Sequence, residues 1–492
     1  MDYVNANVLK DYLLMIIPQL KIIIDNSLTK GIFPAKWAQG TIIPIPKKGD
    51  MSNLSNWRPI TLLPAMSKIM ERVVHSQLMD HMMENHLLSK FQFGFTPGRS
   101  TADAVHELGQ HIYSAINKGK LSSCLFIDMR KAFDTVHHGR LLNKLGQLGA
   151  NTCVLKWFCS YLSQRKHKTL ANNKLSDLTH VTFGVPQGSI LGPLLFSVYI
   201  NELPECIDNS KVILYADDAV MMTEGKTAAD ITRIGQPDLN KILDWCALNR
   251  LTINSDKTVQ VVYGTKPKTS TVKPPLLKIG DDDVVAQKSF SYLGVTLDEN
   301  MKLDTHISVI KKSCGYKLYQ SHKVRTYINR NDALTIYKHC TLPSLEYCSF
   351  MLDSANKVNQ RKLQVLQNKG LRDCLQIRDP QEISEIELHQ ECQISNLSRR
   401  RDSQLLLHIH KLAKDSDNLV TIERVRTRGD VKVRLIAPRA KLRVVKKSPL
   451  HRGLILWNTL DADTQKIDSR AAFKQAIERI DFTEIKARHN MY

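Results

Sequence analysis

The chain has 492 residues, and its 69 Lys and Arg against 48 Asp and Glu give a formal net charge of +21. This length allows about two to four domains, and the charge is typical of a chain that meets a polyanion, either nucleic acid or an anionic membrane surface. No run of about 18 apolar residues and no signal peptide is found, which argues against a membrane protein and predicts a location in the nucleus and cytoplasm.

The N-terminal part of the chain predicts two helices with a strand between them. Residues 13–24 form the most apolar segment, and because polar residues interrupt it, it predicts a buried helix rather than a membrane span. Residues 41–46 alternate with prolines, which predicts an edge strand followed by a turn. Ser100 and Asp103 have the spacing of a capping box, so we expect a helix over about residues 101–118.

Two apolar stretches in the middle of the chain carry acidic residues. Residues 125–127 precede Asp128, and residues 212–222 hold Asp217 and Asp218 near their centre. Short apolar runs predict buried strands, so the second stretch predicts a hairpin with both acids at its turn. Asp is common in turns, and the hairpin alone fits that ordinary role equally well. If the first strand pairs beside the hairpin, Asp128 and Asp217 share one site suited to Mg²⁺, which prefers oxygen ligands.

The second half of the chain predicts helices and a basic ribbon. From about residue 304 the period is helical, and one helix carries Lys362 and Arg372 beside apolar residues, so one face can pack while the other follows a nucleic-acid backbone. Residues 431–435 and 441–444 alternate strictly, which predicts a two-stranded ribbon with one basic face. Such a face suits a phosphate backbone, and the alternative is a solvated surface hairpin. The basic positions of the ribbon are Lys432, Arg434, Lys441 and Arg443.

Three longer motifs occur in a fixed order: FIDMRKAFD at residues 126–134, GVPQGSILGP at 184–193 and YADD at 215–218. Together they resemble the first catalytic motif, the PQG motif and the YxDD box of reverse transcriptases from non-LTR retrotransposons of the LINE type, Jockey-like elements among them. The resemblance extends from about residue 28 to at least residue 347, and more weakly to the C-terminus. Because long motifs in the right order rarely coincide by chance, this signal is far stronger than YADD alone.

The resemblance implies an α+β fold, a right-hand polymerase. Its palm would hold a mostly antiparallel sheet and its thumb would be helical. The implied divisions are fingers over residues 1–120, palm over 121–265, a primer-grip hairpin over 266–303, thumb over 304–380 and a basic C-terminal domain over 381–492.

The resemblance also implies roles for individual residues at a polymerase site. Asp128 and Asp217 would bind two Mg²⁺ ions, with Mn²⁺ possible, and Asp218 would support them. The residues expected to contact the incoming nucleotide are Lys47 and Arg58 at the triphosphate, Phe133 beneath the sugar, Gln187 and Gly188 at the base pair, Tyr215 of the YADD motif, and Lys257 at the leaving pyrophosphate. For Lys257 a surface lysine is the more ordinary interpretation, since Lys is usually exposed.

Nucleic-acid contacts are expected outside the catalytic motifs as well. Arg99 would touch the template backbone, although a surface arginine fits nearly as well. Tyr292 and Gly294 belong to a segment, residues 290–297, that is similar to the primer grip and would present its backbone to the primer end. The thumb residues Lys362 and Arg372 and the basic ribbon would follow the duplex.

The implied activity is RNA-directed DNA synthesis from a primer 3′-hydroxyl, with an RNA template, a DNA primer and dNTPs as partners and no membrane. No endonuclease pattern is found, so a nuclease acting in trans is expected to supply the nick. One alternative is a catalytically idle, domesticated or decaying fragment that only binds RNA, but no catalytic acid is missing. An RNA-dependent RNA polymerase is a second alternative. Phe133 argues against it, because a bulky side chain there would exclude a 2′-hydroxyl.

Overall fold

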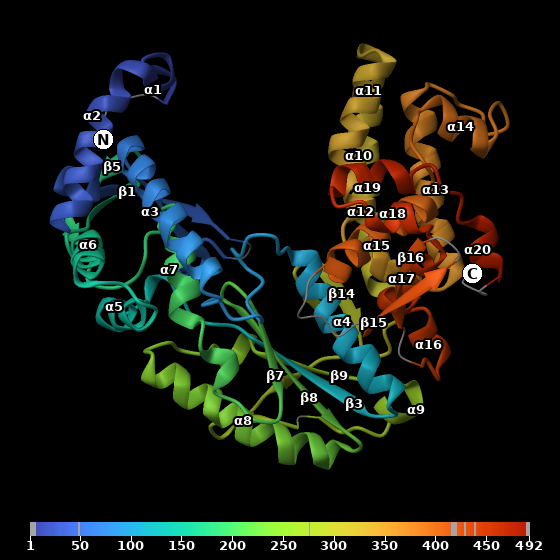
Figure 1. Ribbon diagram of the computed structural model, residues 1–492, viewed down its shortest axis with the longest axis horizontal. Helices are drawn as coiled ribbons and strands as arrows, with labels where there is room; N and C mark the ends of the chain where they lie inside the picture. The colour runs from blue at the N-terminus through green and yellow to red at the C-terminus, as the bar shows by residue number, and fades with distance from the viewer. Residues whose placement is uncertain are drawn as a thin grey trace.

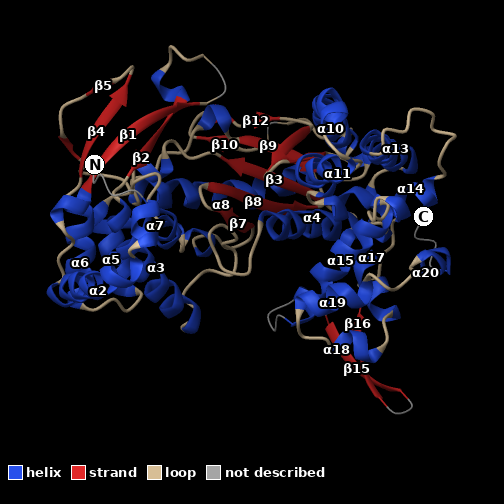
Figure 2. Cartoon of the chain, turned by 90° about the horizontal axis from the view of Figure 1, so that it is seen from above, coloured by secondary structure: helices blue, strands red, loops and turns tan. Residues whose placement is uncertain are grey.

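Two arms rise from a central sheet, and Figure 1 shows the open space between them. The computed structural model describes residues 6–47, 50–274, 276–414, 421–427, 430–436 and 439–488. The described residues up to 84 and the segment 138–180 build one arm, and the described residues from 304 onward build the other. Figure 2 shows the same arrangement from above, with the sheet between the two groups of helices. The mixed α+β architecture expected from the sequence is confirmed.

The central sheet is built from five strands in the order β12-β9-β3-β8-β7. Their bounds are β3 Leu121–Ile127, β7 Lys211–Tyr215, β8 Asp218–Gly225, β9 Val259–Tyr263 and β12 Val285–Ala286. All seven residues of β3 are buried because the sheet is covered on both faces. Cys124 and Phe126 join a core with α4 (Thr101–Asn117), whereas Leu125 and Ile127 join a core with α8 (Ala228–Leu248). The alternation of a strand therefore sends neighbouring residues of β3 into two separate cores.

A second sheet lies in the N-terminal arm and corrects the predicted edge strand. Here β1 (Gln39–Pro46) pairs antiparallel with β2 (Trp57–Leu62) and parallel with β4 (Lys166–Ala171), so β1 is a central strand. The prolines fit because β4 pairs only with residues 39–42, which leaves Pro44 and Pro46 beside a single neighbouring strand. The short strands β5 (Lys174–Leu175) and β6 (Thr179–His180) also pair with β4. Residues 166–171 lie inside the range expected for the palm, yet they belong to the sheet of the N-terminal arm.

Helices surround this second sheet and extend to the side of the central sheet that holds β7. Their bounds are α1 Ala6–Asp11, α2 Leu13–Lys30, α3 Ala65–Glu84, α5 His138–Gln147, α6 Thr152–Ser163 and α7 Leu191–Ile200. The helix predicted over residues 13–24 is present as part of α2, but the prediction that it is buried is wrong. Leu14 is 88% exposed and Met15 is 73% exposed, because α2 packs against α6 along one side only. Among the described residues, no helix has the length and apolar character that a membrane crossing requires.

The capping box and the hairpins predicted from the sequence are present. The Ser100 hydroxyl accepts a hydrogen bond from the Asp103 amide, while the Asp103 carboxylate accepts one from the Ser100 amide, so α4 begins where predicted. Strands β13 (Ser289–Tyr292) and β14 (Val295–Asp298) form the hairpin expected over residues 290–297. Beyond the sheet, a short helix α9 (Lys266–Thr269) precedes the small hairpin of β10 (Lys278–Ile279) and β11 (Asp282–Asp283).

The second arm is helical from residue 304 onward, as the sequence period predicts. Its helices are α10 Asp304–Val324, α11 Arg330–Ile336, α12 Leu342–Glu346, α13 Lys357–Cys374, α14 Glu385–Glu391, α15 Leu397–Lys414, α16 Arg443–Lys446, α17 Pro449–Thr459, α18 Ala462–Lys466, α19 Arg470–Ile477 and α20 Thr483–Arg488. These helices share one apolar core with α4 and with one face of the central sheet. That shared core joins the second arm to the central sheet.

The prediction of a two-stranded basic ribbon is correct for its first strand and wrong for its second. Strand β16 (Asp430–Ile436) contains residues 431–435, but its partner is β15 (Thr421–Thr427), which precedes it. Residues 443–446 form α16 instead of a strand. The reason lies at the end of α4, where the Asn117 amide donates to the Arg439 carbonyl and accepts from the Lys441 amide, at 2.8 Å each. These bonds hold the segment after residue 439 against α4 and away from β16.

Candidate active site

Three acidic residues meet at one edge of the central sheet. Asp128 follows the last residue of β3, and the pairing of Ile127 with Ala219 sets that strand end beside the β7–β8 hairpin. Asp217 lies in the hairpin turn and Asp218 begins β8. All three line one open cleft of about 1710 Å³ between the central sheet and the sheet of β1 and β2. The predicted hairpin, and the pairing of β3 beside it, are therefore present.

The electrostatics of the cleft are those of crowded like charges. Burial raises the pKa of Asp217, and the nearby Asp128 carboxylate raises it further. Burial, followed by the charges of Asp217 and Asp128, raises the pKa of Asp218 to about 6. Carboxylates crowded in this way are a suitable donor set for a divalent cation, which removes the repulsion. Within the described ranges, no three His, Cys, Asp or Glu side chains close on a point as a complete metal cage. A cation here would complete its shell with water and substrate oxygens, as Mg²⁺ does.

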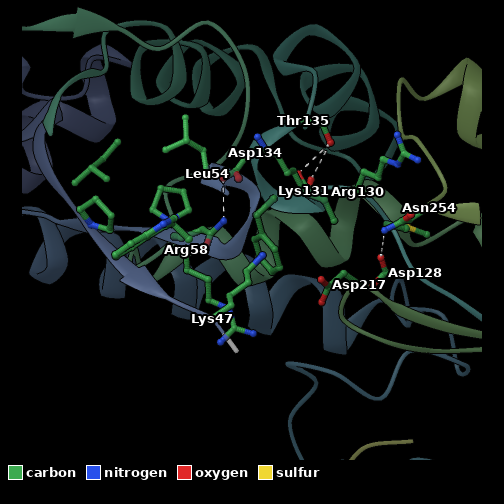
Figure 3. A pocket seen from close by; sticks show the side chains of 18 of the residues that line it. Lys47, Leu54, Arg58, Asp128, Arg130, Lys131, Asp134, Thr135, Asp217 and Asn254 are labelled. Carbon is green, nitrogen blue, oxygen red and sulfur yellow. Dashed lines mark hydrogen bonds between the residues drawn. The ribbon is translucent and has the colours of Figure 1, made fainter. Parts of the chain in front are cut away.

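Asn254 fixes the position of Asp128, and the sequence analysis assigned it no role. Its side-chain amide donates to the Asp128 carboxylate at 3.0 Å, and its backbone N–H donates to the Asp128 carbonyl at 2.8 Å (Figure 3). The Thr258 hydroxyl accepts from the Asp128 amide at 3.3 Å. The carboxylate is thus held by the chain that leads into β9, more than a hundred residues away in sequence.

Gln92 fixes the turn that carries Asp217. It is fully buried, and its side-chain oxygen accepts from the backbone N–H groups of Gly94 at 2.8 Å and Ala216 at 3.3 Å. Ala216 has a positive φ of 56°, which is costly for a residue with a side chain and needs support from its surroundings. A Cβ on Gly94 would collide with the backbone nitrogen of Ala216. The only sequence signal for this support was the cluster of Gln, Gly and aromatic residues over 91–95.

The cleft also contains basic residues on the side opposite the acids. Lys47 follows β1 and Arg58 lies on β2, and both side chains are exposed in the cleft. Figure 3 shows them across the cleft from Asp128 and Asp217. Their positive charges lower the pKa of Asp217 against the effect of burial, which shows that the two sides interact. Lys257, expected at the leaving group, lines the same cleft with an exposed side chain.

Phe133 and Gln187 are held in the lining of the cleft by neighbouring side chains. Phe133 lines the cleft while its ring stacks on Phe196, with centroids 4.6 Å apart, so it is packed on one side and open on the other. Gln187 also lines the cleft, and its side-chain amide donates to Asp134 at 2.9 Å. Helix α7 begins shortly after Gln187, at Leu191.

Two of the expected nucleotide contacts are not among the described residues that line the cleft. Gly188 has a positive φ of 115°, and a Cβ there would lie 2.6 Å from the Thr61 carbonyl oxygen, so contact with β2 requires glycine. Tyr215 is half-buried against the core shared with α4 and is absent from the described lining of the cleft.

The residues expected at nucleic acid occupy varied positions. The Arg99 guanidinium donates to the Lys90 carbonyl and lies 4.9 Å from the centre of the Phe93 ring. The Tyr292 side chain is only 3% exposed, so the β13–β14 hairpin can offer its backbone there but not that ring. Gly294 forms the hairpin turn with a positive φ of 81°, and the Tyr347 hydroxyl donates to the Leu293 carbonyl at 2.6 Å.

The basic residues of the second arm are dispersed. Lys362 and Arg372 lie on α13, where Lys362 is exposed and Arg372 half-buried. Lys432 and Arg434 lie on β16, and the Arg434 side chain is exposed. Lys441 and Arg443 were expected on the second strand of the ribbon. Lys441 instead lies before α16 and Arg443 at its start, and both side chains are exposed.

Clustered carboxylates on a sheet edge, facing basic residues across a cleft, are the arrangement of a right-hand polymerase. The model of the family "Reverse transcriptase (RNA-dependent DNA polymerase)" matches residues 45–297, slightly more than half of the chain. The chain belongs to this family, and the resemblance seen in its motifs is confirmed. Reverse transcriptases use divalent metal ions.

The relatives that the chain matches are polymerases of mobile elements. It is 32% identical over 436 residues to the probable RNA-directed DNA polymerase from transposon BS of Drosophila melanogaster, covering 84% of this chain and 47% of that protein. It is 29% identical to the polymerase from mobile element jockey of the same species, over 72% of this chain and 39% of that protein. The chain therefore spans less than half the length of these relatives. A telomerase from Candida Tropicalis is a distant structural likeness, with a TM-score of 0.41 and 12% identity over 94% of this chain and 67% of that chain.

Proposed function

We propose that this chain is an RNA-directed DNA polymerase of a non-LTR retrotransposon, extending a primer 3′-hydroxyl with dNTPs along an RNA template. One observation carries the proposal. In a chain of the reverse transcriptase family, Asp128, Asp217 and Asp218 share one cleft with Lys47 and Arg58. The alternative of an idle RNA-binding fragment is less favoured, because all three carboxylates are at the cleft and residues outside the motifs support two of them.

The carboxylates are proposed to hold two Mg²⁺ ions, for which Mn²⁺ can substitute. Asp128 and Asp217 would be the principal ligands and Asp218 the supporting one. When bound, these ions supply charge stabilisation to the attacking and leaving oxygens of phosphoryl transfer. The chain itself would position the two carboxylates, because Asn254 holds Asp128 and Gln92 holds the turn of Asp217 before substrate arrives.

The basic side of the cleft is proposed to bind the nucleotide. Lys47 and Arg58 would neutralise the triphosphate, and the guanidinium fork suits two phosphate oxygens at once. Phe133 would lie beneath the sugar and exclude a 2′-hydroxyl, because its ring rests on Phe196 and cannot easily move aside. Gln187 would contact the nucleotide with the amide that now bonds Asp134, and Lys257 would protonate the leaving pyrophosphate.

The template and primer are proposed to follow the open side of the palm. The turn at Gly294 offers backbone groups to the primer end. The basic groups expected to follow the duplex are Arg99, Lys362, Arg372, Arg434, Lys441 and Arg443. We expect the protein in the nucleus and cytoplasm, and we expect the nick that primes synthesis to come from a nuclease in trans or from an existing break.

The test is primer extension by the purified protein on poly(rA)/oligo(dT) with Mg²⁺ and dTTP. Asp217→Asn should abolish extension while leaving the thermal unfolding temperature at or above that of the unchanged protein, because the amide keeps the shape and removes the charge. Asp282→Asn is the matched control, since Asp282 is exposed on the distant β10–β11 hairpin. Extension by Asp217→Asn at the rate of the control would refute the assignment of the site.

A further inference from the structure

A group of buried charges lies in the second arm, away from the polymerase cleft. Asp353 accepts from the Arg401 guanidinium at 2.8 Å and pairs with Arg452. Asp402 pairs with Arg452 at 3.4 Å and with Lys486. Each of these five side chains is more than nine-tenths buried. Charges at this depth are costly unless they are closely compensated.

The cluster contains more cations than carboxylates, and the excess surrounds a small cavity. The cavity has a volume of about 160 Å³, and the described residues that line it include four cations, Lys357, Lys447, Arg452 and Lys486, and one carboxylate, Asp353. Within the described residues, the Arg452 Nε–H, at the wall of this cavity, has no hydrogen-bond partner. The other nitrogens of this guanidinium face Asp353 and Asp402, and an added anion would give its Nε–H the acceptor that it lacks among the described residues.

The chemistry of the wall is suited to a tetrahedral oxyanion. Ser398 contributes a hydroxyl, and Lys486 donates to it at 2.8 Å, so polar groups as well as charges face the space. Burial and the neighbouring charges of Arg443, Arg452 and Lys357 lower the pKa of Lys447 more than the Asp353 carboxylate raises it, as expected where cations outnumber carboxylates. An oxyanion would accept from several of these donors at once.

We infer that this cavity binds a phosphate group. The wall comes from the start of α13, from α15, α17 and α20, and from the end of α16, which lie together in the arm of Figure 1. The phosphate therefore links helices on both sides of residue 380, the boundary expected between thumb and C-terminal domain. The inference does not depend on polymerase activity. The phosphate comes either from a free anion or from the backbone of a bound nucleic acid, and the two sources are separated by experiment.

The first measurement is thermal unfolding of the full chain, freed of nucleic acid, as inorganic phosphate is titrated at constant ionic strength. Lys447→Gln removes one cation of the wall. Lys446→Gln is the matched control, because Lys446 is the preceding, exposed residue of α16 and lies outside the cavity wall. The unchanged protein and Lys446→Gln should gain stability together as phosphate is added. Lys447→Gln should need about tenfold more phosphate for the same gain, the effect of one lost charge-assisted hydrogen bond.

The order of the unfolding temperatures of the two variants should reverse when phosphate is added, and this reversal distinguishes a binding role of Lys447 from a structural one. Without phosphate, Lys447→Gln should unfold at or above the temperature of Lys446→Gln, because it relieves crowded positive charge. With saturating phosphate, Lys447→Gln should unfold at a lower temperature than Lys446→Gln. If Lys447→Gln does not yield folded protein, Lys357→Gln tests the opposite wall, with Arg361→Gln as control on the next turn of α13.

The source of the phosphate is tested with a short single-stranded RNA that carries no terminal phosphate. If the backbone fills the cavity, Lys447→Gln lowers the slope of log Kd against log salt by about 0.7 relative to Lys446→Gln. If a free anion fills it, the RNA slopes agree and only inorganic phosphate separates the variants. Agreement of both variants in both measurements overturns the inference.

Discussion

Gln92 allows a sharp test of how the catalytic turn is held. Gln92→Met keeps the volume of the side chain and removes the oxygen that accepts from Gly94 and Ala216. Two buried N–H groups lose their acceptor. The bond at 2.8 Å is close to ideal and that at 3.3 Å is long, so the expected loss of unfolding free energy is about 2–4 kcal/mol, at about 1–3 kcal/mol for each unsatisfied group. Because Ala216 precedes Asp217, its displacement should also misplace that carboxylate and lower kcat about 100-fold.

Gln260→Met is the matched control for this experiment. Gln260 is also buried, and it donates to Ser123 at 2.8 Å and accepts from the Leu276 amide at 3.1 Å. Its loss should lower stability by a similar amount without touching the turn, so kcat should stay within about threefold of the unchanged enzyme. Urea unfolding gives the free energies, and single-nucleotide extension at a temperature where both variants are folded gives kcat. Equal kcat values for the two variants would refute the positioning role of Gln92.

Three further predictions concern the cleft. The raised pKa of Asp218, about 6, means that its ionised form destabilises the folded state above that pH and that this penalty disappears as the pH falls toward about 4. Asp218→Asn should therefore be more stable than the unchanged protein by about 1 kcal/mol at neutral pH without divalent cations, since the full shift would be about 3 kcal/mol before solvent screening of this exposed group. Urea unfolding of Asp218→Asn and of the unchanged protein at neutral pH and at a pH of about 4 tests this. An equal difference in unfolding free energy at the two pH values would contradict it. Phe133→Val should lower the ratio of kcat/KM for dNTP over rNTP, and an unchanged ratio would leave Phe133 with a packing role only. Asn254→Ala should raise the Mg²⁺ concentration needed for half-maximal extension, whereas a lower kcat at unchanged Mg²⁺ dependence would contradict its action through Asp128.

Local patterns in the sequence were sufficient for much of the fold. The alternation and turn residues around Asp217 predict the β7–β8 hairpin, and the spacing of Ser100 and Asp103 predicts the start of α4. Both features depend on contacts between residues close in sequence, which a pattern records directly. The motifs around the three acids also indicated the family, because each spans several residues in a fixed order.

Only the tertiary structure decided how these pieces are supported. Gln92 lies behind the turn of Asp217 across 124 residues of chain, and the side-chain bond from Asn254 to Asp128 spans 126. Neither bond leaves a local pattern, since a buried amide looks like any polar residue in the sequence. The errors have the same cause. Residues 443–446 form a helix because the preceding segment is held at Asn117, and the apolar α2 stays exposed because it packs along one side only. Periodicity indicates which face of an element is apolar, but the chain's distant partners determine whether that face is covered.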